Sequence, residues 1–98
     1  MAANNYLITG AGRGIGRGLS RHLLQKGNRV VLIDNNVAEL KNTASLLSGK
    51  GHTRGEDFET IECNLRQPSE ITSAAKKTGE FFNNHLDCLI NNAACQSS

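Results

Sequence analysis

A doubly wound α/β fold with a parallel sheet is predicted from three features of the sequence. Short apolar runs alternate with longer stretches whose apolar residues recur every three or four positions. A cluster of glycines directly follows the first apolar run. The chain has 98 residues, which suffices for one small domain. Alternating strands and helices are typical of a parallel sheet with helices on both faces, and here we expect the sheet to be truncated after its fourth strand.

The first two strands and the helix between them are the most clearly marked elements. Asn5–Thr9 carries three consecutive apolar side chains and ends before a glycine, as a strand buried on both faces should. A helical pattern follows over residues 14–26, and Gly27 is placed to end that helix in a left-handed turn. Arg29–Asp34, with the sequence RVVLID, is rich in β-branched residues and predicts the second strand.

The second helix and the third strand are predicted from weaker patterns. Asn35 or Asn36 can cap a helix that runs from residue 37 to about residue 48. Residues 49–57 are polar and glycine-rich and predict a loop. Residues 58–63 alternate weakly and fit a third strand.

The last helix and strand complete the alternation. Pro68 is suited to the first turn of a helix that extends to about Asn84. Residues 86–90, with the sequence LDCLI, predict a fourth strand. Such an apolar parallel strand normally lies inside a sheet, and an uncovered edge would favour aggregation and little stable fold.

Composition and charge exclude several classes of function. The 11 basic residues nearly balance the 9 acidic ones and are scattered, so neither a nucleic-acid surface nor a membrane surface is expected. No apolar stretch could span a bilayer, and the start MAANN does not resemble a secretory signal. Cys63, Cys88 and Cys95 form no CxxC pair, so we expect reduced thiols, a cytoplasmic protein and no metal site.

The glycine-rich stretch YLITGAGRGIG at residues 6–16 predicts a nucleotide-binding turn. Unpaired amides at a helix start attract anions, and glycines let a pyrophosphate approach the backbone closely. The common GxGxxG spacing fails, because Ile15 or Arg17 stands where its third glycine should be. The spacing that fits is TGxxxGxG, formed by Thr9, Gly10, Gly14 and Gly16, and it resembles the cofactor loop of the short-chain dehydrogenase/reductase family. That resemblance implies a Rossmann-like dinucleotide-binding domain.

Other segments agree with the resemblance. Asp34 ends the second strand, where the family places the residue that reads the adenosine ribose. The NNAA sequence at residues 91–94 resembles the family's NNAG, with alanine in place of its glycine. Cys63-Asn64-Leu65 resembles the Asp-plus-aliphatic pair near adenine, with Asn64 in place of the acid.

The resemblance also implies roles for single residues in cofactor binding. The three motif glycines would shape the loop, and the amide of Ile15 would contact the pyrophosphate. Leu65 would border the adenine, with an altered contact from Asn64. Asn91 and Ala93 would line the ribose side of the pocket, and Asn91 would also brace the sheet or simply cap its strand.

The choice between NAD and NADP depends on two side chains of opposite charge. Asp34 can accept hydrogen bonds from both ribose hydroxyls of NAD and would repel the additional phosphate of NADP. Its alternative role is to cap the following helix. Arg13 favours NADP by resemblance, unless it is simply an exposed loop arginine, and Arg17 is expected to be solvated on its helix. We therefore expect NAD as the cofactor, with NADP as the alternative.

The residues that would perform catalysis in this family are absent from the sequence. The family resemblance implies a tyrosine proton donor tuned by a lysine four residues later, together with a serine. Tyr6 is the one tyrosine, and Gly10 lies four residues after it. His22, His52 and His85 are expected to be structural or solvated, and no cysteine is placed as a nucleophile. No catalytic residue is therefore assigned, and we expect the chain alone to be inactive.

Two classes of function remain open at this point. The chain resembles the N-terminal, cofactor-binding part of an NAD(P)-dependent oxidoreductase. Such an enzyme would act on a small alcohol or carbonyl substrate only in a full-length form, which could be a homo-oligomer. Alternatively, the chain is a non-catalytic module that binds nucleotide or pairs its exposed strand with another protein.

Overall fold

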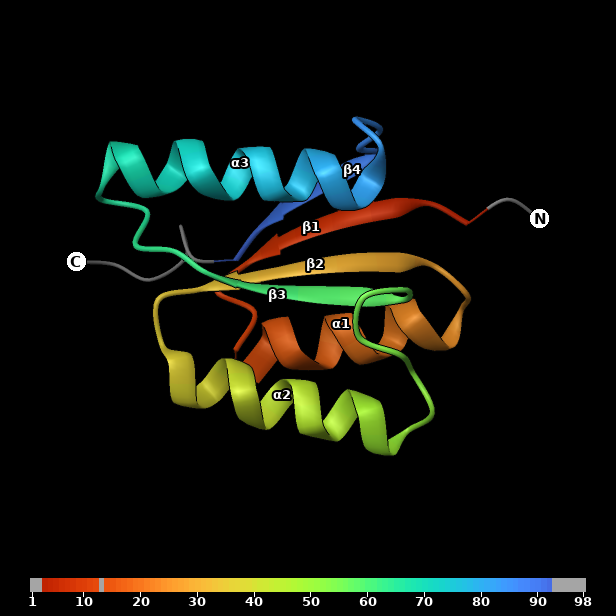
Figure 1. Cartoon of the computed structure of the whole chain (residues 1–98). Coiled ribbons are helices and arrows are strands. Elements are labelled where there is room, and N and C mark those ends of the chain that lie inside the picture. Colours follow the sequence, from red (N-terminus) through yellow and green to blue (C-terminus); the bar gives the residue numbers. More distant parts are fainter. Residues whose placement is uncertain (1–2, 13, 93–98) are drawn as a thin grey trace.

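The computed structural model describes residues 3–12 and 14–92, and it contains a parallel sheet between layers of helices (Figure 1). All the strand pairs are parallel, and the order across the sheet is β3-β2-β1-β4. The strands are β1 (Asn5–Thr9), β2 (Arg29–Asp34), β3 (Phe58–Glu62) and β4 (Cys88–Asn91).

The helices cover both faces of this sheet. Figure 1 shows α3 on one face, with α1 and α2 together on the other. Their bounds are α1 (Gly14–Gln25), α2 (Val37–Gly49) and α3 (Pro68–Phe82). This arrangement confirms the predicted doubly wound α/β fold.

The core is divided by the sheet into two clusters because successive side chains of a strand point to opposite faces. Val30 and Leu32 of β2 point toward α1 and α2, whereas Val31 and Ile33 point toward α3. Val30, Val31 and Leu32 are completely buried, as expected for a strand covered on both faces. Sheet and helices are therefore held by apolar packing on each side of β2.

The ends of the later elements differ slightly from the sequence prediction. Helix α3 ends at Phe82, before the predicted Asn84, because Asn83 and Asn84 both adopt left-handed backbone with φ of 53° and 59°. Strand β4 begins at Cys88, two residues later than predicted. The bounds of β1 and β2 are those predicted.

Strand β4 lies at one edge of the described sheet and is poorly covered. Leu89 in β4 is 55% exposed, and Leu86 just before it is 45% exposed. An apolar edge of this kind is the surface on which strands of other chains can pair. Within the described residues, no helix combines the length and the apolar character needed to cross a membrane.

A hydrogen-bonded turn before β4 ties that strand to the start of the chain. The Asp87 carboxylate accepts a hydrogen bond from the Asn5 backbone N–H at 2.8 Å. Asn5 Nδ2 in turn donates to the His85 carbonyl at 2.7 Å, and His85 Nε2 lies 2.9 Å from Asp87 Oδ1. The Asn5 hydrogen bond, with a smaller contribution from His85, lowers the pKa of Asp87 below its ordinary value of 3.8.

This lowered pKa predicts an acid-sensitive contribution to stability. A carboxyl group with a lower pKa in the folded state stabilises the fold above its unfolded pKa, and that contribution is lost as pH falls through the folded value. We therefore expect Asp87→Asn to destabilise the protein more at about pH 5.5 than at about pH 3. Urea unfolding of both proteins at the two pH values measures this difference. An equal loss of stability at both values would contradict the prediction.

Candidate functional site

The loop between β1 and α1 contains the glycine motif, and its backbone explains two of the motif glycines. Gly10 has φ of 65° and Gly14 has φ of 60°. These left-handed angles are unfavourable for residues with a side chain. The chain thus turns sharply from the end of β1 into the first turn of α1.

Gly16 is required for a different reason, which is close packing. A Cβ at Gly16 would lie 2.5 Å from the Gly10 carbonyl oxygen and 2.7 Å from the Ala11 Cα. Both obstacles are backbone atoms, so they cannot rotate away. The absence of a side chain lets the first turn of α1 lie directly against the loop.

The start of α1 offers a favourable position for an anion. The first amides of a helix have no carbonyl within the helix to accept their hydrogen bonds, and the helix dipole adds partial positive charge. The first turn of α1 contains no acidic residue, whereas α2 and α3 carry Glu39 and Glu70 there. Ile15, in this first turn, is 72% exposed.

Asp34 at the end of β2 is oriented by two backbone groups. Its Oδ2 accepts a hydrogen bond from the Gly12 N–H at 2.9 Å, and its Oδ1 accepts one from the Asn36 N–H at 3.0 Å. The residue that caps α2 is Asn36, whose side chain accepts from the Glu39 N–H. A carboxylate has about four lone-pair positions, so Asp34 can accept further hydrogen bonds from a ligand.

Arg17 corrects one expectation from the sequence. It was expected to be solvated, but its side chain is only 32% exposed and reaches from α1 across to the loop and α2. Its guanidinium donates to the Gly12 carbonyl at 2.6 Å and to the Thr43 hydroxyl at 2.8 Å. It also lies 3.6 Å from the Glu39 carboxylate.

The segment after β3 places the predicted adenine-side residues at the same edge of the sheet. Asn64 Oδ1 accepts a hydrogen bond from the Arg66 N–H at 2.9 Å, and Leu65 is 40% exposed. Cys63 is buried, and its burial, together with the negative charge of Glu70, raises the pKa of its thiol. Cys63 therefore stays protonated at neutral pH and is unsuited to act as a nucleophile.

The end of β4 is joined to the end of β1 by side chains. The Thr9 hydroxyl donates to Asn91 Oδ1 at 2.9 Å, and Asn92 Nδ2 donates to the Gly10 carbonyl at 3.1 Å. These bonds connect the predicted Asn91 to the beginning of the glycine loop. Arg13 and Ala93, the other predicted site residues here, lie outside the described residues.

The structure thus brings those predicted residues that it describes to the carboxyl edge of the parallel sheet. Ligands in open α/β folds bind at this edge. Gly12, Arg17 and Thr43 have no role in the site that the sequence predicts. Thr43 stands on the apolar stripe of α2, three residues after Leu40 and four before Leu47. A hydroxyl at such a buried position requires a partner, so the sequence could have indicated a hydrogen bond there but not that its acceptor is in the loop.

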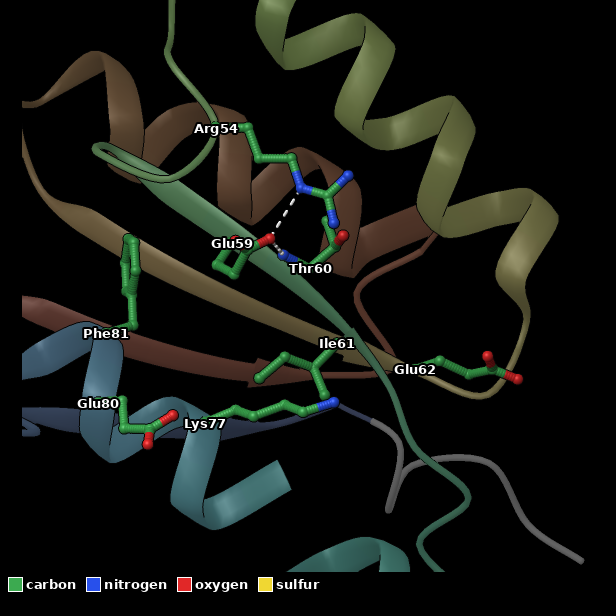
Figure 2. Close-up of a pocket in the computed structure, with 8 residues that line it drawn as sticks. All are labelled: Arg54, Glu59, Thr60, Ile61, Glu62, Lys77, Glu80 and Phe81. Atoms are coloured by element: carbon green, nitrogen blue, oxygen red, sulfur yellow. Dashed lines mark hydrogen bonds and ion pairs between the residues drawn. The ribbon is translucent and has the colours of Figure 1, made fainter. Parts of the chain in front are cut away.

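A separate groove lies between β3 and α3 and does not coincide with this edge. Figure 2 shows its lining residues, and the groove has a volume of about 480 Å³. Its walls carry both signs of charge, including the Arg54–Glu59 ion pair at 2.7 Å. None of the predicted cofactor residues lines it. Across residues 3–12 and 14–92, no three His, Cys, Asp or Glu side chains are grouped to hold a metal ion.

Comparisons with known proteins point to one family. The family model described as short chain dehydrogenase matches residues 4–98. Oxidoreductase UcpA of Escherichia coli (strain K12) is 33% identical over 93 residues, which cover 95% of this chain and 33% of that protein. The 15-hydroxyprostaglandin dehydrogenase (NAD(+)) of Macaca fascicularis is 33% identical over 87 residues, covering 89% of this chain and 32% of that protein.

A solved structure agrees with the fold. The 3-ketoacyl-(acyl-carrier-protein) reductase from Brucella melitensis, complexed with NADH, has a TM-score of 0.74 and 23% identity. The match covers 88% of this chain and 32% of that one. The present chain therefore spans about a third of the length of the curated relatives it matches.

Proposed function

Because this chain belongs to the short-chain dehydrogenase family, we propose that it binds the adenosine diphosphate portion of a nicotinamide dinucleotide. In this proposal it is the N-terminal part of an oxidoreductase that acts on an alcohol or carbonyl substrate. The single observation that best supports it is the glycine loop at the carboxyl edge of the sheet, with Asp34 hydrogen-bonded to its backbone.

The predicted site residues that the structure describes have distinct parts in this proposed binding. The pyrophosphate would lie against the first amides of α1, where Gly14 carries no side chain to obstruct it and Gly16 lets the helix pack against the loop. The Asp34 carboxylate accepts hydrogen bonds from the adenosine ribose. Leu65 and Asn64 border the adenine, and Asn91 contributes to the ribose side. In the full-length enzyme, the nicotinamide ring of the cofactor would exchange the hydride with the substrate.

Asp34 also supports NAD over NADP as the cofactor. Two backbone N–H groups hold its carboxylate at the end of β2, so it cannot easily turn away from an approaching ligand. A 2′-phosphate at that place would meet a fixed negative charge. One relative carries NAD(+) in its name, and one similar structure holds NADH.

The test is a comparison of ligands by titration calorimetry on the 98-residue chain. A site that contacts only adenosine and pyrophosphate should bind ADP and NAD weakly, with dissociation constants that agree within about threefold. Binding of NAD more than about tenfold tighter than ADP would contradict this half-site. We also expect no reduction of NAD over a panel of alcohols, because the sequence contains no YxxxK.

The exposed edge of β4 supports a second candidate, in which this chain pairs with another protein. Leu89 and Leu86 expose apolar surface there. Sedimentation of the purified chain separates the two candidates, since a monomer that binds ADP supports the first alone. The cytoplasmic location and a homo-oligomeric full-length form stay predictions.

A further inference from the structure

We propose that Arg17 and Thr43 are positioning residues that hold the β1–α1 loop in the conformation that accepts the nucleotide. The inference rests on the proposed function for its ligand, but its structural part concerns the loop alone. Neither residue is proposed to touch the cofactor. Both act through the Gly12 carbonyl.

Three hydrogen bonds form a closed ring around this carbonyl. The Thr43 hydroxyl donates to the Gly12 carbonyl at 2.6 Å, and the Arg17 guanidinium donates to the same oxygen at 2.6 Å. Arg17 Nε donates to the Thr43 hydroxyl at 2.8 Å. Thr43 is completely buried, so water cannot readily replace its hydroxyl. Loss of either side chain leaves the others incompletely paired.

The N–H of Gly12 is held by Asp34, the residue proposed to bind the adenosine ribose. The Gly12 N–H donates to Asp34 Oδ2, so both the N–H and the carbonyl of this residue are held by hydrogen bonds. A Cβ on Gly12 would lie 2.8 Å from Asp34 Oδ2 and 2.9 Å from Glu39 Cβ. The loop is therefore pressed against the end of β2 and the first turns of α2. A shift of Gly12 would disturb both the loop and the orientation of Asp34.

The charge of Arg17 contributes less than its hydrogen bonds. Its ion pair with Glu39 spans 3.6 Å, and both side chains are partly exposed, at 32% and 26%. Solvent screening makes such pairs weak. The two short donor contacts, to the loop and to Thr43, join α1 to α2 across the loop.

Arg17, Thr43 and the Gly12 carbonyl together form a clamp on the loop, and this clamp favours ligand binding through preorganisation. A loop that is already in its binding conformation has less conformational entropy to lose when the ligand arrives. If only a fraction of the molecules holds that conformation, the apparent affinity falls by the same fraction. Removing the clamp should therefore lower the affinity for ADP and for NAD by the same factor, because both ligands contain the adenosine and the pyrophosphate.

The experiment compares clamp variants with matched variants elsewhere. Thr43→Val and Arg17→Met remove the clamp, and Thr43→Ser restores the hydroxyl. Thr78→Val is the control for Thr43→Val, because the buried Thr78 hydroxyl donates to the Ala74 carbonyl at 2.8 Å within α3. Arg29→Met is the control for Arg17→Met, because the Arg29 guanidinium also makes two hydrogen bonds, in its case to the carbonyls of Glu56 and Phe81.

Two readouts are measured on each variant: the ADP dissociation constant, and amide exchange at Gly12 without ligand. We expect Thr43→Val and Arg17→Met to raise the ADP dissociation constant about three- to tenfold. The amide exchange rate of Gly12 should increase by a similar factor. Thr43→Ser and the two control variants should stay within about twofold of the wild type.

The outcomes separate this inference from the proposed function. An unchanged amide exchange rate of Gly12 in both clamp variants would overturn the proposal that Arg17 and Thr43 hold the loop, regardless of the ADP dissociation constant. Faster exchange with unchanged ADP affinity would overturn its role in binding. A wild-type chain that binds no ADP would overturn the proposed function, while the exchange readout would still decide the structural part of the clamp.

Discussion

Replacing Gly16 by alanine is expected to lower the free energy of unfolding by about 2–3 kcal/mol and to eliminate measurable ADP binding. The new Cβ would stand 2.5 Å from the Gly10 carbonyl oxygen and 2.7 Å from the Ala11 Cα. These atoms belong to the backbone of the loop between β1 and α1. The strain can be relieved only if α1 moves away from the loop, and this movement displaces the amides that would hold the pyrophosphate.

Gly18→Ala is the matched control in the same helix. A Cβ at Gly18 would meet no atom within 4 Å. The substitution should therefore stabilise the protein by about 0.5–1 kcal/mol, because alanine favours helix more than glycine does. Urea unfolding and ADP titration measure both variants. Equal behaviour of the two alanine variants would show that close packing at Gly16 has no special role.

The strands and the loop could be predicted from sequence because their causes are local. An apolar run such as Arg29–Asp34, bounded by turn residues, fits a strand buried on both faces, and the structure places β2 at those residues. The glycine spacing predicted a sharp turn into a helix, and Gly10 and Gly14 have the left-handed angles that such a turn needs. Both patterns lie within a few consecutive residues.

The prediction that Arg17 would be solvated on its helix was wrong, because the partners of its side chain are brought to it by tertiary packing rather than by a local pattern. Its partners are Thr43, 26 residues later in the chain, and the Gly12 carbonyl. Only the packing of α1 beside α2 brings them together, and no local pattern describes this packing. The same holds for Gly12, whose lack of a side chain is explained by Asp34 and Glu39 on other elements.

The end of α3 shows how a local signal can be ambiguous. The helical pattern extends to about Asn84, but asparagine is also one of the residues that tolerate left-handed backbone. The Asn84 N–H bonds back to the Gly79 carbonyl at 2.8 Å, which closes the helix early. This hydrogen bond shows that the two asparagines end the helix rather than extend it, which the residue types alone do not determine.

Asp34→Asn is expected to reduce the preference for NAD over NADP by about tenfold, or ~1.4 kcal/mol. The substitution keeps the size of the side chain and one acceptor oxygen, but it removes the negative charge that would repel a 2′-phosphate. One of the two backbone N–H groups, from Gly12 or Asn36, loses its acceptor. We therefore expect a parallel loss of about 1 kcal/mol in the free energy of unfolding.

Glu39→Gln is the control for this prediction, because Glu39 is a carboxylate close to the same loop and ion-paired with Arg17. Titration of each protein with NAD and with NADP measures the preference directly. If Glu39→Gln changed the preference as much as Asp34→Asn does, general negative charge would be responsible. A preference that changes only in Asp34→Asn assigns the discrimination to the carboxylate that the Gly12 and Asn36 amides hold in place. The backbone of the glycine loop would then contribute to cofactor choice by orienting that carboxylate, in addition to binding the pyrophosphate.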